Sequence, residues 1–223
     1  MKNYTLKVLL LGLALFGLGT ASYHRAGLQA PSVTNKITAV EVISLVPTDH
    51  GSDLVLRNVS LKNINGYSVA LKSGAYTTVD LTVGDRVIGP GGQFTVRLRA
   101  EATEPSIRYV VFDDDTGEGD TSAIAELQDR RAGRREQLNR IVPLLNSAAV
   151  SANVDQLKTD LQSLPEEAAG RSVYFGLGMK NAKEDALLEV RKLDNSNVRA
   201  GLTRLAEQSN RRMIQSKTKQ ANP

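Results

Sequence analysis

The sequence has no cysteine and no tryptophan, and only two of its 223 residues are histidine. Without cysteine there is no disulfide, no thiol nucleophile and no Cys-based zinc site, so the fold must be held by its core. Aromatic residues make up 4% of the chain, which is little for a carbohydrate platform or a base-stacking surface. His24 and His50 are far apart, and neither lies in a zinc-ligand spacing such as H-E-x-x-H.

The signatures of the common catalytic sites are also missing. The sequence contains no G-x-S-x-G elbow, no P-loop and no G-x-G-x-x-G fingerprint. Hydrophobic residues reach 41% and charged residues 23%, which is typical of a chain with an ordinary core. The composition therefore predicts a folded protein that is not an enzyme.

Residues 1–22 have the features of an export signal. Lys2 and Lys7 give a positive start, residues 8–18 form an uncharged apolar run, and residues 19–22 are small. Because the run is shorter than the roughly 20 residues needed to cross a bilayer, a cleaved signal is favoured over an uncleaved anchor. We expect an extracytoplasmic protein, periplasmic or secreted, with a flexible leader over residues 23–33.

Residues 34–120 show the alternation of short β-strands. Phe94, Val96 and Leu98, for example, alternate with polar residues, so one face is buried and one is wet. About seven strands with turns every 8–12 residues predict an antiparallel immunoglobulin-like sandwich that folds on its own, and a small closed barrel is the alternative. Tyr67 and Phe94 are interpreted as core residues. The expected breaks are Pro47, the turn at 49–53, Asn65-Gly66 and the loop at 89–92.

The motifs at residues 54–60 (LVLRNVS), 64–67 (INGY) and 88–94 (IGPGGQF) resemble those of bacterial extracytoplasmic immunoglobulin-like modules. In those modules an L-x-L-x-N-x-S strand is followed by a proline-glycine turn. Together with residues 110–112 and 117–120, the chain is similar to a group of uncharacterised exported bacterial proteins with a signal, a sandwich and C-terminal helices. The resemblance implies a fold and a compartment, and it carries no catalytic residue.

Beyond residue 120 the apolar residues recur every third or fourth position, which is typical of helices. We expect three to four helices within residues 121–215, at about 122–146, 153–164, 181–193 and 196–214, and a disordered tail at 216–223. Asp120 or Thr121 is the expected N-cap of the first helix, and Pro143 a point where it bends. The apolar patch 172–179 is expected to be buried or to begin the third helix. The predicted fold class is α+β.

The acidic, glycine-containing turn at residues 113–120 is the one constellation that suggests a site. Asp113, Asp115, Glu118 and Asp120 offer hard oxygen ligands of the kind that Ca²⁺ prefers, although their spacing is not that of an EF-hand. The favoured interpretation is that Asp and Gly make a turn and cap a helix. No cofactor is expected, and Ca²⁺ at these four carboxylates is the alternative.

Charge divides with the predicted architecture. Residues 33–120 hold 8 basic and 12 acidic residues, a net charge of −4, and residues 121–223 hold 17 basic and 12 acidic, a net charge of +5. We interpret these as two solvated surfaces, because exposed ion pairs contribute only ~0–1 kcal/mol each. The alternative is that the acidic turn meets the arginines at 130–135.

The sequence favours an exported, non-enzymatic interaction or structural module of the cell envelope. Its partner is an unknown protein or a second copy. A nucleic-acid partner is not expected, since the basic helix lacks interleaved aromatic residues, and contact with a membrane is expected only through an uncleaved signal. A Ca²⁺-binding or hydrolytic protein built on the acidic turn is the alternative.

Overall fold

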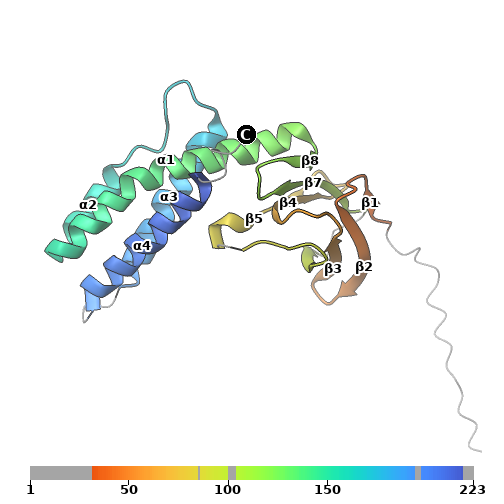
Figure 1. The fold of residues 1–223 in the computed structure, drawn as a ribbon, viewed down its shortest axis with the longest axis horizontal. Coiled ribbons are helices and arrows are strands. Elements are labelled where there is room, and N and C mark those ends of the chain that lie inside the picture. Colours follow the sequence, from red (N-terminus) through yellow and green to blue (C-terminus); the bar gives the residue numbers. More distant parts are fainter. Residues whose placement is uncertain (1–31, 85, 100–103, 194–196, 218–223) are drawn as a thin grey trace, which may run out of the picture. The chain divides into compact units, whose positions relative to one another are not determined.

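The first half of the chain forms two β-sheets, and the second half forms helices, which confirms the predicted α+β order (Figure 1). The computed structural model describes residues 32–84, 86–99, 104–193 and 197–217, with the backbone alone at 214–217. One sheet has the order β1-β7-β4-β5 with β8 also on β7, and the other has the order β2-β3-β6. The strands are β1 (Thr34–Asn35), β2 (Val40–Thr48), β3 (Gly51–Asn58), β4 (Ile64–Ala70), β5 (Tyr76–Asp80), β6 (Gln93–Arg99), β7 (Ser106–Phe112) and β8 (Gly117–Gly119).

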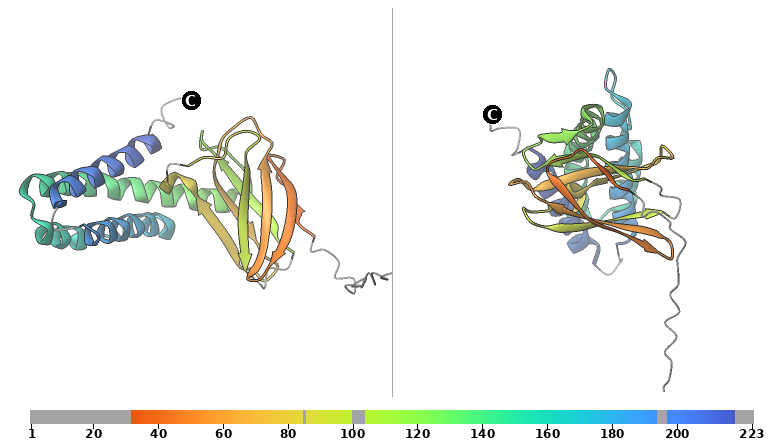
Figure 2. Two further views of the ribbon diagram at one scale, coloured as in Figure 1. Left: turned by 90° about the horizontal axis from the view of Figure 1, so that it is seen from below. Right: turned by 90° about the vertical axis from the view of Figure 1, so that its right-hand side faces the viewer.

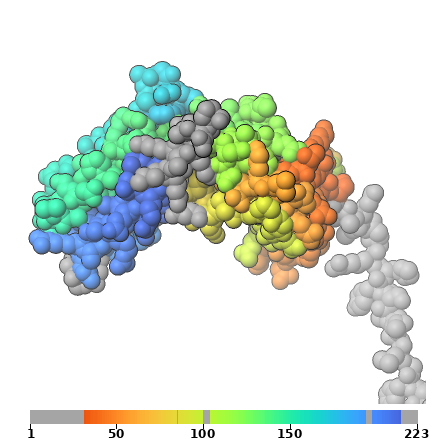
Figure 3. All heavy atoms as spheres, in the orientation of Figure 1, coloured from red at the N-terminus to blue at the C-terminus, as the bar shows by residue number. Residues whose placement is uncertain are grey.

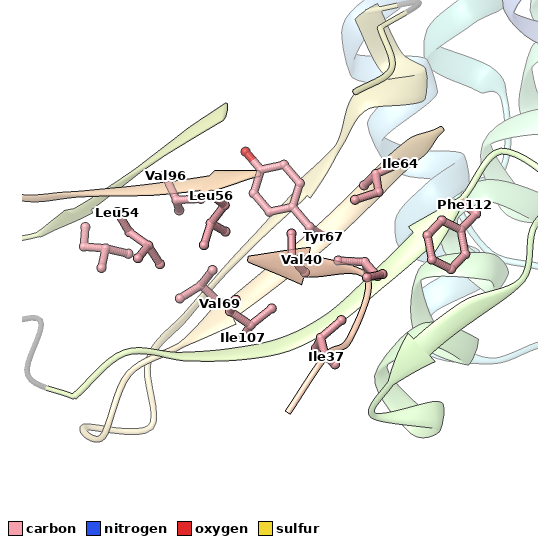
Figure 4. Packing of buried hydrophobic residues seen from close by; sticks show 13 residues of the cluster. Ile37, Val40, Leu54, Leu56, Ile64, Tyr67, Val69, Val96, Ile107 and Phe112 are labelled. Carbon is pink, nitrogen blue, oxygen red and sulfur yellow. The ribbon is translucent and has the colours of Figure 1, made fainter. Parts of the chain in front are cut away.

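The two sheets share one hydrophobic core, and this follows from the alternation of apolar residues. Leu54 and Leu56 of β3 and Val96 of β6 come from the three-stranded sheet, and they meet Val69 of β4 and Ile107 of β7 (Figure 4). Each of these side chains is at most 6% exposed. The residues between them in sequence face away, so the strand period of two separates the core from the outer faces.

Tyr67 and Phe94 belong to this core, as the sequence predicts. Tyr67 is 7% exposed, Phe94 is partly buried against the same cluster, and the centroids of their rings are 4.8 Å apart. The two rings link β4 to β6 across the core, and the tilted arrangement is one that aromatic pairs favour.

The prediction that the first strand stops at Pro47 is wrong. β2 runs on to Thr48, and a two-residue turn at Asp49-His50 leads into β3. In hairpins with a two-residue turn, the residues that flank the turn, here Thr48 and Gly51, exchange hydrogen bonds. Successive residues of a strand direct their backbone groups to opposite sides, so the backbone nitrogen of Pro47 points away from β3. β2 is the edge of its sheet. Pro47 therefore costs no ladder hydrogen bond.

The prediction of a turn at Asn65-Gly66 is also wrong, because both residues lie inside β4. The pairing of β4 with β7 shifts by one residue between Ile64 and Gly66. A Cβ on Gly66 would lie 2.9 Å from Nη2 of Arg131 and 3.0 Å from Cδ2 of Leu127. The glycine therefore marks a close approach of a helix to the strand.

Asn58, at the end of the L-x-L-x-N-x-S motif, ties three segments together. It is fully buried, and its Nδ2 donates to the carbonyl oxygens of Lys62 and Ile88, each at 2.8 Å. Its Oδ1 accepts from the backbone N–H and the hydroxyl of Ser60. Its own N–H donates to the carbonyl of Gly92. The motif thus holds the loop after β3 against the loop before β6.

Four helices follow in the described part of the chain, and the views of Figure 2 show them running alongside one another. α1 extends five residues past its predicted end and continues through Pro143. The patch at 172–179 begins the third helix, which therefore starts earlier than the predicted residue 181. The helices are α1 (Thr121–Ser151), α2 (Val154–Ser163), α3 (Val173–Arg191) and α4 (Val198–Lys217), and a short 3₁₀ turn, η1 (Leu81–Gly84), follows β5.

The helices have a core of their own, built by the predicted apolar stripes. Its members come from the second half of α1 and from all three following helices. Among the described helices, none is long and apolar enough to cross a membrane. The largest fully buried members are Ile141 and Leu145 of α1, Leu157 and Leu161 of α2, and Leu202 of α4.

The first turns of α1 instead cover the outer face of the five-stranded sheet. Ala123, Ile124 and Leu127 pack on Tyr109 and Val111 of β7, and all five side chains are at most 8% exposed. The β half is therefore not closed by its own residues on this face. That residues 34–120 fold without the helices stays a prediction.

Candidate functional site at the strand–helix junction

The acidic turn begins with carboxylates that serve the turn and its neighbours. Asp113 accepts a hydrogen bond from Nδ2 of Asn63 at 2.9 Å. Asp115 has a positive φ of 62° and lies 3.5 Å from Nη1 of Arg131, and its backbone carbonyl accepts from Nε2 of Gln128 at 2.8 Å. Both residues are thus bonded to groups outside the turn.

The last two carboxylates of the predicted metal set hold other elements in place. Glu118 accepts from the backbone N–H groups of Thr38 and Ala39. Asp120 is the N-cap of α1, as predicted, because it accepts from the N–H of Ala123 at 3.1 Å. The four carboxylates thus have separate protein partners, and the part of the chain that the structure describes holds no group of three or more metal-ligating side chains.

Calcium is expected to leave the melting temperature unchanged. A metal bound only to the native state would raise the stability by RT ln(1 + [L]/Kd), which at 100 times the Kd is about 2.7 kcal/mol. Because Asp113, Asp115, Glu118 and Asp120 are each bonded to a different protein group, we expect the same melting temperature in millimolar Ca²⁺ and in chelator. A higher melting temperature in Ca²⁺ that Asp113→Asn abolishes would establish the alternative site.

Asp114 is the acidic residue of the turn whose ionisation is most perturbed. Burial disfavours its charged form, but hydrogen bonds from Lys62 and Thr116 outweigh this effect and hold its pKa at about 2. Nζ of Lys62 lies 2.7 Å from the carboxylate. The charged form is therefore favoured in the folded protein.

Asp114→Asn is expected to lower the free energy of unfolding at pH 7 by less than about 1 kcal/mol, since 45% of the Asp114 side chain is exposed. The folded pKa lies below the ordinary 3.8, so the carboxylate stabilises the fold above pH ~4, and this contribution is lost as the pH falls toward 2. Urea unfolding at pH 7, 4 and 2 should show the two proteins converging in acid. A constant difference would mean that the charge is not the cause.

Arg131 connects α1 to the five-stranded sheet from a buried position. Its side chain is 6% exposed, and its Nη2 lies 2.9 Å from Oδ1 of Asp80 at the end of β5. The same Nη2 donates to the backbone carbonyl and to Oδ1 of Asn65, each at 3.0 Å. Asp115 lies on the remaining side as an ion-pair neighbour of Nη1, and Nη1 itself has no hydrogen-bond partner among the described residues.

This arrangement corrects the interpretation of the charges as two solvated surfaces. One arginine of the 130–135 cluster does meet the acidic turn, and it does so buried rather than exposed. Arg134 pairs with Asp185 of α3 at 2.7 Å, and Arg140 pairs with Glu136 at 2.9 Å. Three of the arginines that a nucleic-acid interpretation would use are therefore already paired with carboxylates.

Asp120→Ala is expected to cost about 1 kcal/mol, mainly through loss of the N-cap. Asp120 also pairs with Nε of Arg108 at 2.9 Å, a pair that is partly exposed and adds at most ~1 kcal/mol. Asp120→Asn is the matched control, because asparagine caps as well as aspartate but does not carry the charge. If urea unfolding showed equal losses for both variants, the ion pair and not the cap would be the main contribution.

Sequence reasoning missed several residues of this junction. Asp80 stands alone in a strand and carries no motif, and the sequence places Asn65 in a turn. Two further polar residues meet on the neighbouring strands β4 and β5, where the partly buried hydroxyl of Thr78 donates to that of the buried Ser68 at 3.2 Å. Burial raises the pKa of Tyr109. One signal in the sequence could have indicated these residues. They are the polar residues that alternate with apolar ones along the strands, and so lie on the outer face of the sheet.

We compared the chain with protein-family models, with curated proteins and with solved structures, and none of the three comparisons found a match.

Proposed function

We propose that the chain is an exported, non-enzymatic interaction module of the cell envelope, in which an immunoglobulin-like sandwich carries a firmly attached helical arm. The observation that carries the proposal is the buried guanidinium of Arg131, bonded to Asp80 and Asn65 and close to Asp115. Two carboxylates of the predicted site, Asp115 and Asp120, contact α1 and help to join it to the sheet. We assign these residues a structural role, and we assign partner binding to the exposed surfaces of the sheets and helices.

The strand pairing supports the immunoglobulin-like assignment. In that fold the second and fifth strands pair in one sheet, and the third and sixth pair in the other. If β2 is taken as the first strand, β3 pairs with β6 and β4 with β7 in the same way. β2 lies beside β3 in one sheet. In the other sheet β5 lies beside β4, and β1 and β8 lie beside β7.

Export is part of the proposal, and it rests on the sequence of residues 1–22. Those residues lie outside the described part of the chain. Intact-mass measurement of the protein recovered from its own cells tests export. A mature N-terminus near residues 21–23 is expected, and a mass that includes residues 1–20 would favour an uncleaved anchor.

Site-specific photo-crosslinking in the native cell envelope tests the interaction function. A photoreactive residue would replace Thr95 on β6, Val46 on β2 or Leu177 on α3, three exposed positions on different elements. We expect the capture to depend on the position of the photoreactive residue. At least one position should reproducibly capture the same protein, identified by mass spectrometry, and at least one other position should not. Capture from none of them would overturn the proposal that the module works by binding a partner.

A further inference from the structure

The free edges of the two sheets are not equivalent. β1, β8 and β5, at the sides of the larger sheet, have 2, 3 and 5 residues. β2 has 9 residues, but it carries Pro47 and a bulge at Ile43, and both features block the addition of another strand. β6 has 7 residues, no proline and an unbroken register with β3. Among the described strands, β6 pairs with β3 alone.

The backbone of β6 presents regular hydrogen-bonding groups at this edge. The N–H of Asn58 at the end of β3 donates to the carbonyl of Gly92, just before β6. Because every second residue of an antiparallel strand bonds the same neighbour, the even-numbered residues of β6 bond β3. The N–H and C=O groups of Gln93, Thr95, Arg97 and Arg99 therefore point to the free edge. The side chains of these four residues are exposed, whereas Val96 and Leu98 face the core.

The charge at the edge has one sign. Arg97 and Arg99 lie two residues apart on the same face of β6, and within the described ranges neither has a carboxylate within ion-pair distance. Asp53 stands opposite Arg97 on β3, and Gly51 stands opposite Arg99. In the view of Figure 3 the orange to yellow-green atoms of the β half, which include β2, β3 and β6, reach the surface.

We propose that the β6 edge binds an extended segment of a partner protein as a fourth strand, and that this segment has acidic residues at alternate positions. This inference rests on the proposed interaction function and names its surface. The main-chain groups of the odd-numbered residues pair with the added strand, which is the general mode of strand addition to a sheet edge. Cross-strand neighbours lie about 4.5–5.5 Å apart, so two acidic side chains in an i, i+2 pattern meet Arg97 and Arg99.

A second copy of the same edge fits less well than an acidic strand. If two β6 strands paired, Arg97 and Arg99 of both copies would lie on the same face of the joined sheet. Like charges on neighbouring strands are destabilising, so this pairing is disfavoured. The edge arginines thus discourage self-pairing and favour an acidic partner.

The test uses the full-length mature protein and a labelled peptide of about seven residues, the length of β6, in which glutamate alternates with valine. Binding is followed by NMR of the backbone amides. We expect the largest shifts at Thr95, Arg97 and Arg99, and a Kd that rises about tenfold or more in the Arg97→Glu/Arg99→Glu variant. Arg199→Glu/Arg204→Glu on α4 changes the net charge equally at two exposed positions and should leave the Kd unchanged.

Two further peptides and one variant separate strand addition from charge attraction. A lysine-for-glutamate peptide should not bind, and a glutamate peptide methylated at alternate backbone nitrogens should bind at least about tenfold more weakly. Thr95→Pro removes a donor at the free edge without removing a bond to β3, so it should weaken binding while the melting temperature stays near that of the parent.

Shifts confined to other elements, or pairing of β6 with itself, would overturn the inference. Photo-capture from Val46 or Leu177 alone would overturn it as well, but would leave the proposed interaction function standing.

Discussion

Arg131→Met is expected to lower the free energy of unfolding by about 3–5 kcal/mol, the usual cost of removing one partner from a buried ion pair. Methionine fills a similar volume but removes the charged donor from the Asp80 carboxylate, which keeps only the hydrogen bonds from the N–H and hydroxyl of Thr82, and from the carbonyl of Asn65. Arg131 is 6% exposed and the Asp80 side chain 15%, so water cannot easily replace the lost hydrogen bonds. Urea unfolding with a linear extrapolation gives the measurement.

Three control variants separate the charge of Arg131 from its geometry. Arg131→Lys keeps the charge but not the planar fork that reaches two acceptors, so an intermediate loss is expected. Arg134→Met breaks a pair whose acidic partner, Asp185, is 49% exposed, and it should cost no more than about 1 kcal/mol. Adding Asp80→Asn to Arg131→Met should restore part of the stability. If the double variant were as unstable as the sum of the single ones, the buried carboxylate would not be the source of the loss.

The two halves of the fold could be predicted from periodicity alone, because a strand and a helix bury apolar residues at different spacings. The alternation of Phe94, Val96 and Leu98 placed the core face of β6 correctly. Turn chemistry was less informative, since Asn65-Gly66 is a strong hairpin signal but lies inside β4. There the glycine is needed because Leu127 and Arg131 of α1 approach the strand. The need for glycine at this position comes from the packing of a distant helix, so the local sequence does not indicate it.

The junction was only partly predictable for the same reason. Asp120 as a helix cap follows from local chemistry, and the structure confirms it. The partners of Arg131 do not, because Asn65 and Asp80 lie 66 and 51 residues away in the sequence. A set of four carboxylates within eight residues resembles a metal site when only their spacing is known. In the fold Asp113 bonds Asn63, Glu118 bonds the backbone of residues 38 and 39, and Asp115 and Asp120 bond different groups of α1. Proximity in sequence therefore does not become convergence in space.

Gly178→Ala and Gly133→Ala are each expected to cost about 3 kcal/mol, the upper end of the usual cost of overpacking, because α1 and α3 touch backbone to backbone at these glycines. A Cβ on Gly178 would lie 2.0 Å from the carbonyl oxygen of Arg130, and a Cβ on Gly133 would lie 1.9 Å from that of Phe175. Neither contact can be relieved by a side-chain rotation, so the two helices must move apart and lose packing along their length. Urea unfolding and amide exchange along α3 measure the loss.

Gly176→Ala is the matched control, because Gly176 lies on the same helix two residues before Gly178 but does not face α1. Its Cβ would meet no atom closer than 3.2 Å, and alanine is the better helix former by about 1 kcal/mol. We therefore expect it to leave the stability within about 1 kcal/mol of the parent. The Gly133→Ala/Gly178→Ala double variant should lose less than the sum of the single losses, because helices already separated by one methyl group leave room for the second. Strict additivity would mean that each glycine is required by its own backbone and not by the shared crossing.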